Sequence, residues 1–346
     1  MLTSSKLQLS IILPIYNVEP YLEKCIRSLE NQDIPKDSYE IICVNDGSPD
    51  NCLSIIKQMQ SEFLNIVLLD QENQGVSMAR NNGIKAAKGE YLMFVDPDDA
   101  IEANCLKEIV AFAKKRELDI VYSPLTFVEI DGSMQHSYFK DEVINKELEG
   151  SDLYFTVRRK QIIDPDRAYA ILYKRNLIFD YDLYYLKDVP YLEDGEFIAR
   201  VLCLAKRTAI YNKPYYLRLN RPGSATRSDL FNQRKTIKGF ILAAKNLRNF
   251  KEDLELNERQ IGLINGRIVK FVVLAVHATL KSYKNFTWVK KELKNEEFGR
   301  LDLSGIKVKT YYYELGELYN RSLDLLYISS KLKNLKKSIK IRIGKA

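Results

Sequence analysis

The sequence predicts an α/β protein with a mixed, mostly parallel sheet flanked by helices, followed by a C-terminal helical region. Between residues 7 and 99, short apolar runs alternate with longer amphipathic segments. Strands separated by single helices imply right-handed crossovers in a parallel sheet. From about residue 230 the composition is that of long helices rich in lysine, asparagine and leucine. A Pro-Gly-Ser turn at 222–224 places the boundary between regions 1–228 and 229–346.

Four strands and three helices are expected in the first hundred residues. The strands are apolar runs of five or six residues: Gln8–Leu13, Tyr39–Val44, Asn65–Leu69 and Tyr91–Val95. The first of these strands is expected to be stopped by Pro14. In the helices, apolar residues recur at helical spacing, over Glu19–Glu30, Leu53–Phe63 and Val76–Ala87.

After Asp99 the alternation becomes irregular. Asp131-Gly132-Ser133 stands between two apolar runs and predicts a hairpin of residues 125–130 and 134–139. The remaining expected elements are helices over 102–116 and from Glu193 through Ala205, and strands over 119–122, 170–173 and 208–217.

Composition argues against several classes of protein. The five cysteines form no CxxC pair, which indicates reduced thiols in a cytoplasmic protein and no zinc site. The only histidines, His136 and His277, are too far apart in sequence to suggest a shared metal site. No GxGxxG or GxxxxGK[ST] motif is present, which argues against dinucleotide dehydrogenases and P-loop NTPases. No apolar run of membrane-spanning length and no signal peptide are expected.

The net charge of +7 is concentrated at the C-terminal end. Residues 331–346 hold seven basic side chains and no acidic one, so the remaining 46 basic residues balance the 46 acidic ones. Leucine and isoleucine alternate with these charges, a pattern that suits the anionic inner face of the cytoplasmic membrane. A nucleic acid is the rival partner, though none is expected, and a solvated terminus is nearly as good an explanation.

Three carboxylates follow the fourth predicted strand within four residues, in Asp96-Pro97-Asp98-Asp99. Clustered carboxylates repel one another, and Mg²⁺ or Mn²⁺ relieves that repulsion while sharing its coordination with substrate phosphates. Ligands of open α/β sheets bind at this end of the strands. An Asp-rich turn before a helix explains the same residues without a metal.

The loops after the four strands resemble those of the inverting family 2 glycosyltransferases with the Rossmann-like GT-A fold. The resemblance covers roughly residues 7–227 and consists of five motifs in the family's order. They are Ser10-Ile11-Ile12-Leu13-Pro14-Ile15-Tyr16-Asn17, Val44-Asn45-Asp46-Gly47-Ser48, Asn73-Gln74-Gly75 with Ala79-Arg80-Asn81-Asn82-Gly83, Phe94-Val95-Asp96-Pro97-Asp98-Asp99, and Glu193-Asp194.

The resemblance implies a nucleotide-sugar donor, with a UDP-sugar favoured. Pro14, Tyr16 and Glu19 match positions that line the base and ribose, and Asp46 matches the carboxylate that accepts the base N–H. Arg80 matches an arginine near the base and diphosphate, and Arg221 belongs to a segment resembling the loop that closes over the diphosphate. Further donor-site residues on the same loops are Asn17, Gly47, Asn73 and Gly75.

The resemblance also implies the metal site and the base. Asp96 and Asp98 match the DXD pair, with Asp96 on the ribose or the metal and Asp98 on the metal, Mn²⁺ or Mg²⁺. Asp194 matches the general base that takes the proton of the acceptor hydroxyl, and Glu193 positions the acceptor or Asp194. A helix N-terminus favours acidic residues in any case, so these two positions also have a structural explanation.

The expected activity is transfer of a hexose or N-acetylhexosamine to a glycan or lipid-linked glycan during polysaccharide synthesis. Two alternatives remain: a nucleotidyltransferase, which would need a glycine-rich phosphate loop in place of Pro14-Ile15-Tyr16-Asn17, and an inactive GT-A-like scaffold at the membrane. The sequence leaves open which sugar, acceptor and linkage are used. The C-terminal helices could also form an oligomer.

Overall fold

The computed structural model describes residues 7–139, 144, 146–160, 166–220, 229–306 and 311–343. The chain divides into two compact units, one of residues 1–187 and 201–224 and one of residues 188–200 and 225–346. The segment that carries Glu193 and Asp194 therefore groups with the C-terminal helices. The boundary at residue 228 remains a prediction.

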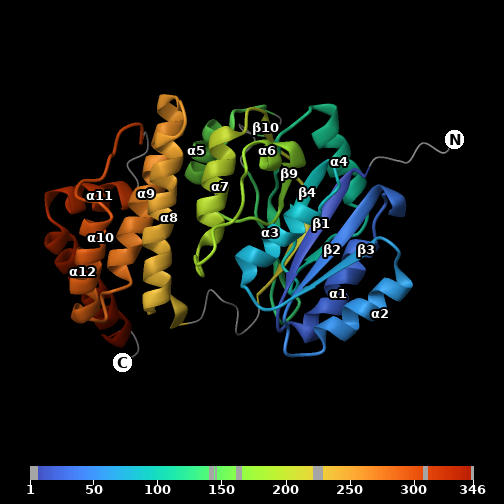
Figure 1. Cartoon of the computed structure of the whole chain (residues 1–346), viewed down its shortest axis with the longest axis horizontal. Helices are drawn as coiled ribbons and strands as arrows, with labels where there is room; N and C mark the ends of the chain where they lie inside the picture. Colours follow the sequence, from blue (N-terminus) through green and yellow to red (C-terminus); the bar gives the residue numbers. More distant parts are fainter. Residues whose placement is uncertain are drawn as a thin grey trace. The chain divides into compact units, whose positions relative to one another are not determined.

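The first unit is built on a seven-stranded sheet in the order β10-β6-β9-β4-β1-β2-β3 (Figure 1). Its strands are β1 (Leu9–Ile15), β2 (Tyr39–Asp46), β3 (Ile66–Gln71), β4 (Tyr91–Phe94), β6 (Ile120–Tyr122), β9 (Ile171–Lys174) and β10 (Thr208–Ile210). Only β9 runs antiparallel to its neighbours β4 and β6 among these strands. The expected mixed, mostly parallel sheet is confirmed.

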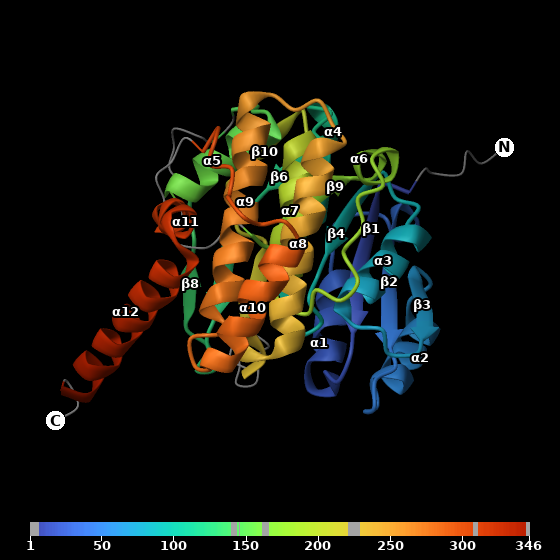
Figure 2. The ribbon, with the colours of Figure 1, turned by 60° about the vertical axis from the view of Figure 1, so that its left-hand side comes forward.

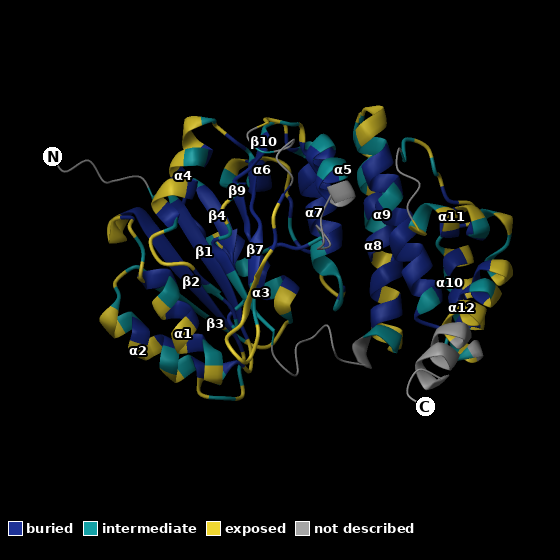
Figure 3. Ribbon diagram, turned by 180° about the vertical axis from the view of Figure 1, so that it is seen from behind, coloured by how far each residue is buried: buried dark blue, intermediate teal, exposed yellow. Residues whose placement is uncertain are grey.

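Helices cover both faces of this sheet. The helices α1 (Glu19–Glu30), α2 (Cys52–Glu62) and α4 (Leu106–Lys115) share one apolar core with the odd-numbered residues of β1. On the other face α3 (Val76–Ala86) lies so close that a Cβ on Gly83 would meet Ile12 Cγ2 at 2.4 Å. The strands β1 and β2 are consequently buried throughout (Figure 3).

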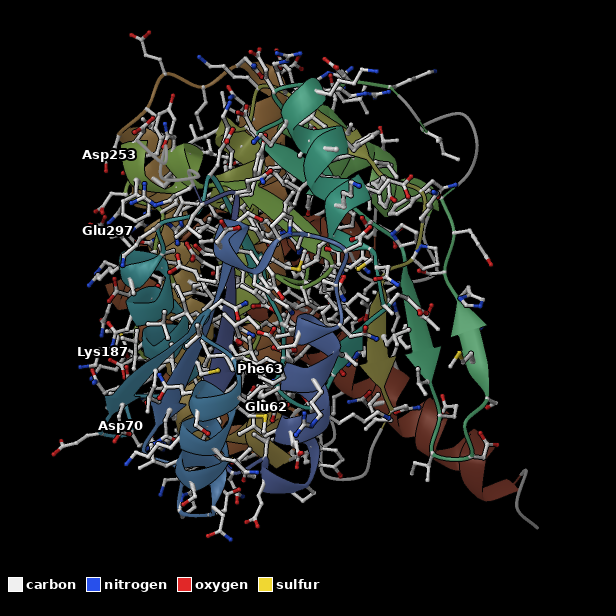
Figure 4. The ribbon with its side chains drawn as sticks, turned by 90° about the vertical axis from the view of Figure 1, so that its right-hand side faces the viewer. Glu62, Phe63, Asp70, Lys187, Asp253 and Glu297 are labelled. Atoms are coloured by element: carbon white, nitrogen blue, oxygen red, sulfur yellow. The ribbon has the colours of Figure 1, made fainter. Side chains whose placement is uncertain are left out.

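Helices α1 and α2 are also joined at the surface. Arg27 of α1 donates to both carboxylate oxygens of Glu62 at 2.9 and 3.2 Å, and Glu62 is labelled in Figure 4. Both side chains are nearly half exposed, so we expect this pair to contribute under about 1 kcal/mol to stability.

The expectation that Pro14 ends the first strand is wrong. Pro14 pairs with Val44 in the parallel register of β1 and β2. The Ile12 carbonyl accepts a hydrogen bond from Val95 on the β4 side, so the Pro14 nitrogen, two residues on, faces that side too. The ladder with β4 ends at the Ile12–Phe94 pair, so the missing proline N–H costs no ladder bond.

Two other expected elements divide differently. The helix expected over 102–116 is shorter, because residues 102–105 form a turn after strand β5 (Ala100–Ile101) and α4 begins only at Leu106. The strand expected over 208–217 is two strands, β10 and β11 (Tyr216–Leu219). They belong to different sheets, since β11 joins β5, β7 (Leu125–Val128) and β8 (Met134–His136) in a four-stranded sheet. The expected hairpin is confirmed as β7 and β8.

Short helices that the sequence did not suggest complete the first unit. These are the 3₁₀ turn η1 (Lys36–Ser38) and the helices α5 (Gly150–Lys160) and α6 (Arg175–Asp180). Helix α7 (Glu193–Leu204) begins in the second unit and ends in the first.

The second unit is helical beyond residue 229, as expected. After the 3₁₀ turn η4 (Asp229–Asn232) it contains α8 (Arg234–Glu252), α9 (Glu258–His277), α10 (Tyr283–Asn295), α11 (Tyr311–Arg321) and α12 (Leu323–Ile343), as Figure 2 shows. Helix α9 packs against α8 and α11. The expectation that no segment reaches membrane-spanning length is wrong, because α9 is long and apolar enough to cross a membrane. However, 78% of its apolar window is buried inside the structure, as in the core helix of a globular protein.

Candidate functional site

The loops after β1, β2, β3 and β4 lie at one edge of the sheet, because these four strands run parallel and adjacent. They carry most of the predicted donor and metal residues. The polar side chains on them come from four separate stretches of the sequence and are held together by the contacts described below.

The Asp46 carboxylate links the loop after β2 to the loop after β3. Its Oδ1 accepts hydrogen bonds from Gln71 Nε2 and from the backbone N–H of Gln74, both at 2.8 Å. Its Oδ2 accepts from the backbone N–H of Gly75 at 2.9 Å. Asp46 is only 2% exposed. The structure therefore gives it a role in shaping the 73–75 loop, and its predicted contact with the nucleotide base stays a prediction.

Gly47 and Asn73 form a second contact between the same two loops. Gly47 has φ of +65°, and a Cβ added there would meet the backbone nitrogen of Asn73 at 2.8 Å. Glycine is thus required twice, for its backbone conformation and for the close approach. Gly75, with φ of +88°, is the N-cap of α3.

The loop after β1 presents an aromatic ring to solvent. Tyr16 is 48% exposed, so about half of its side chain is accessible to a ligand. Asn17 has φ of +53°, a conformation in which asparagine is enriched among non-glycine residues. Its backbone N–H donates to Ser48 Oγ at 3.4 Å, so the loop is tied to the loop after β2.

Glu19 lies at the start of α1 and exchanges hydrogen bonds with the start of α2. The Glu19 N–H donates to Asp50 Oδ2 at 2.9 Å. In return, the Glu19 carboxylate accepts from the backbone N–H and the Nδ2 of Asn51 at 3.1 and 2.9 Å. Each acid thereby satisfies a helix-terminal donor of the other segment. The predicted ribose contact of Glu19 stays a prediction.

In the acidic cluster the three carboxylates have different environments. Asp99 is buried, and it accepts hydrogen bonds from Tyr216 Oη at 2.7 Å and from the Leu219 N–H at 2.8 Å. Burial, together with the charges of Asp96 and Asp98, raises the pKa of Asp99 well above its ordinary value. Asp99 therefore ties β11 to the cluster, whereas Asp96 and Asp98 are only partly buried.

Arg80 pairs with Asp96. Its Nη2 lies 3.1 Å from Asp96 Oδ1, and its guanidinium lies 5.2 Å from the centroid of the Tyr185 ring. Arg80 is 4% exposed and the Asp96 side chain 30%. The arginine therefore orients the Asp96 carboxylate, the first of the predicted DXD pair, from inside the protein. Its predicted contact with the nucleotide stays a prediction.

The chemistry of the acidic cluster fits a divalent cation that shares its ligands with a substrate. Asp96 and Asp98 supply hard oxygen atoms, and their charge helps to raise the pKa of both Asp99 and Cys25. No group of three or more metal-binding side chains occurs among the residues that the structure describes. Diphosphate oxygens and water would have to complete the shell, as is usual for Mg²⁺.

Glu193 and Asp194 form the first turn of α7 and are partly buried. They belong to the second unit, while the loops described above belong to the first. The residue before them, Leu192, has φ of +60°. Arg221, the remaining predicted donor residue, lies outside the described residues.

Sequence reasoning missed Tyr185, Asn81 and Tyr216 as supports of this site. Asn81 donates to the Tyr185 carbonyl and accepts from its N–H, both at 2.8 Å, and so fixes the ring that faces Arg80. Tyr216 Oη accepts from the Asp96 N–H at 3.1 Å while donating to Asp99. Partners more than a hundred residues away leave no local signal in the sequence.

Comparisons with known proteins show which family part of the chain matches. Residues 10–164 match the model of the family described as glycosyl transferase family 2. A poly(ribitol-phosphate) beta-glucosyltransferase of Bacillus spizizenii is 32% identical over 220 residues, which are 63% of this chain and 33% of that protein. The poly(ribitol-phosphate) beta-N-acetylglucosaminyltransferase TarS of Staphylococcus aureus is 30% identical over 219 residues, 63% of this chain and 36% of TarS. The matched region thus spans about a third of these two relatives.

Solved structures support the fold. TarS residues 1–349 in complex with UDP-GlcNAc superpose with a TM-score of 0.69 at 21% identity, covering 96% of this chain and 92% of that one. A mannosyltransferase of Pyrobaculum calidifontis in complex with GDP-Man and Mn²⁺ gives a TM-score of 0.51 at 14% identity. This match covers 95% of this chain and 87% of the mannosyltransferase chain. The match over residues 10–164 places this region in glycosyl transferase family 2, and the chain has the GT-A fold.

Proposed function

We propose that this protein is an inverting glycosyltransferase that moves a sugar from a UDP-sugar to a hydroxyl group of a bacterial surface glycan. The observation that carries the proposal is the partly exposed pair Asp96 and Asp98 at the sheet edge that Asp46, Gly47 and Tyr16 share. The family match supports the reaction class. The ligand named with TarS supports UDP-GlcNAc as the first donor to test, and the names of both relatives support a poly(ribitol phosphate) acceptor.

The transfer is a single displacement at the anomeric carbon. The acceptor oxygen forms the new bond to this carbon, the bond from the carbon to the diphosphate oxygen breaks, and UDP leaves with that electron pair. Asp194 accepts the proton of the acceptor hydroxyl, and Glu193 orients that hydroxyl. Tyr16 stacks on the base, and the loop held by Asp46 binds the nucleoside. A divalent cation held by Asp96 and Asp98 would neutralise the negative charge that develops on the diphosphate.

A thermal-shift panel tests donor binding. Nucleoside diphosphates and nucleotide sugars are added to the full chain with Mn²⁺, with Mg²⁺, or with EDTA. Selective binding to the native state raises the melting temperature by mass action. We expect a Mn²⁺-dependent rise with UDP and UDP-GlcNAc. A well-defined melt that no diphosphate shifts would favour the inactive scaffold, and a shift with nucleoside triphosphates alone would favour a nucleotidyltransferase.

Transfer itself is measured as UDP release from UDP-GlcNAc in the presence of a ribitol phosphate oligomer. The anomeric configuration of the product, read from its proton NMR coupling, tests inversion. Retention of the donor configuration would contradict the single-displacement mechanism.

We also propose that α12 contacts an anionic membrane surface, which would bring the enzyme to a lipid-linked acceptor on the cytoplasmic side. Leu325, Ile328 and Leu332 lie on one side of this helix by their spacing and are 50%, 52% and 55% exposed. Residues 331–346 add only positive charges. A second copy of α12 would bring like charges together, whereas anionic lipid headgroups gain about 1 kcal/mol for each basic residue near them.

Sedimentation with vesicles tests this contact. Binding of the full chain to phosphatidylglycerol vesicles should exceed binding to phosphatidylcholine vesicles. It should fall when residues 331–346 are deleted or when Leu325, Ile328 and Leu332 become serine. Unchanged sedimentation of both variants would remove the proposal, and so would a preference for nucleic acid over lipid.

A further inference from the structure

The segment that leads into α7 has a strained backbone. Asp188 and Leu192 have φ of +67° and +60°, in the left-handed region that residues with a Cβ rarely adopt. Such conformations persist only where surrounding structure holds them. Asp194 follows Leu192 by two residues, so the direction of its side chain depends on how this segment is held.

Helix α8 presses directly on this segment. A Cβ added to Gly239 would lie 2.9 Å from Pro190 Cδ, 3.1 Å from the Asp188 carbonyl oxygen and 3.3 Å from Val189 Cα. The helix therefore touches the backbone of the strained segment at a position where only glycine fits.

Two further contacts join α8 to the same region. The Tyr191 ring packs edge-on against Phe240 of α8, with centroids 6.2 Å apart, and against Phe231 at 6.0 Å. Farther along α8, seven residues after Gly239 and so about two helical turns away, Asn246 Nδ2 donates to Glu196 Oε1 at 2.8 Å.

Glu196 is itself fixed within α7. It is 1% exposed and accepts two hydrogen bonds from Arg200, at 2.6 and 2.8 Å, one turn later. Glu196 stands two residues after Asp194. The first turn of α7 is therefore held by α8 on both sides of Asp194 in the sequence, through Pro190 and Tyr191 before it and Glu196 after it.

We propose that helix α8 positions Asp194 for catalysis, with Gly239 and Asn246 as the positioning residues. The proposal rests on the proposed role of Asp194 as the general base. It gives the C-terminal helices a function in the reaction, because the segment bearing the base packs as part of their unit. Displacement of a catalytic group by about 1 Å lowers the rate by as much as a hundredfold.

The matched substitutions Gly239→Ala and Gly266→Ala test the proposal. Both add one methyl group to a helix, but a Cβ at Gly266 would meet nothing within 4 Å. For Gly239→Ala we expect kcat with UDP-GlcNAc to fall at least tenfold, with the donor KM and the Mn²⁺-dependent UDP affinity unchanged. Gly266→Ala should match the wild type. Wild-type kcat for Gly239→Ala would overturn the proposal.

A rescue and a second variant guard against a general folding defect. Pro190→Ala removes the atom nearest the new methyl group and should restore part of kcat in the Gly239→Ala background. Asn246→Leu removes the bond to Glu196 and should lower kcat at constant donor KM. In both single variants of α8, amide hydrogen exchange over residues 191–196 should quicken, and unchanged exchange with unchanged kcat would contradict the proposal.

Asp194→Asn separates this inference from the proposed function. If Asp194→Asn keeps wild-type transfer, the base is misassigned and the proposed mechanism fails. If Asp194→Asn is inactive while Gly239→Ala and Asn246→Leu are as active as the wild type, only the positioning role of α8 fails.

Discussion

The Asp46 carboxylate accepts a hydrogen bond from the backbone N–H of Gly75 at 2.9 Å, so an acid at the end of β2 holds the N-cap residue of α3. The same carboxylate also accepts from Gln74 and Gln71. One buried side chain thereby fixes the loop between β3 and α3.

Asp46→Asn should destabilise the protein, because an amide cannot accept on both sides. Whichever way the new amide is oriented, its NH₂ group faces the N–H of either Gly75 or Gln74. That buried N–H donor then has no acceptor, at a cost of about 1–3 kcal/mol in the free energy of unfolding. Urea denaturation measures the change. Asp70→Asn is the control, because the exposed Asp70 accepts a single side-chain bond from Asn45 at 2.7 Å. Equal stability of the two variants would contradict the role of Asp46.

Gly47→Ala should cost more stability than Gly132→Ala. Both glycines have a positive φ, +65° and +83°, so both substitutions incur backbone strain of about 1–2 kcal/mol. A Cβ at Gly132 would meet nothing within 4 Å, whereas one at Gly47 would meet the Asn73 nitrogen at 2.8 Å. The difference between the two unfolding free energies isolates the contact between the loops. We also expect weaker UDP binding for Gly47→Ala alone.

Asp98→Asn should abolish the Mn²⁺-dependent part of the thermal shift with UDP. The substitution removes one of two carboxylates offered to the cation, while Asp99 is already engaged by Tyr216 and Leu219. Glu102→Gln removes a nearby exposed acid and should leave the shift intact. A normal shift in Asp98→Asn would show that this residue is not a metal ligand.

Asp194→Asn should bind UDP-GlcNAc with Mn²⁺ as the wild type does but lose transfer by a factor of about 10²–10⁴, the usual contribution of a general base. Such a loss in kcat at constant donor affinity is typical of a group that acts in the transition state. Glu193→Gln should lose less. Titration of donor binding and measurement of UDP release in the same preparations separate the two effects.

The sequence predicts the sheet well where hydrophobic periodicity is local. The runs that become β1 to β4 alternate with amphipathic helices, and their parallel pairing follows from the crossovers. Local pattern fails where long-range pairing decides. Pro14 stays in β1 because the neighbouring ladder has already ended, and residues 208–217 divide because β10 and β11 pair with different partners.

The site shows the same division. The prediction that the motif loops lie together at one edge of the sheet is confirmed by the parallel pairing of β1 to β4. The motifs do not distinguish residues available to a ligand from residues that build the loops. Glu19 and Asp46 are engaged by backbone N–H groups, and Asp99 is engaged by Tyr216, more than a hundred residues away. Such partners depend on tertiary packing, which no short motif contains.

His277 should make stability depend on pH between about 6.5 and 4. Burial, with a smaller contribution from the charge of Lys333, lowers the pKa of His277 from 6.5 to about 4. Between these values the unfolded chain binds the proton and the folded chain does not, so stability falls as the pH falls. His277→Asn retains a polar partner for Ser330 Oγ, which lies 3.0 Å from Nε2, but cannot titrate. From pH 6.5 to 4 the wild type should lose about 2 kcal/mol relative to this variant. Denaturant titrations at successive pH values measure the difference, and a difference that stays constant across this range would show that His277 titrates normally.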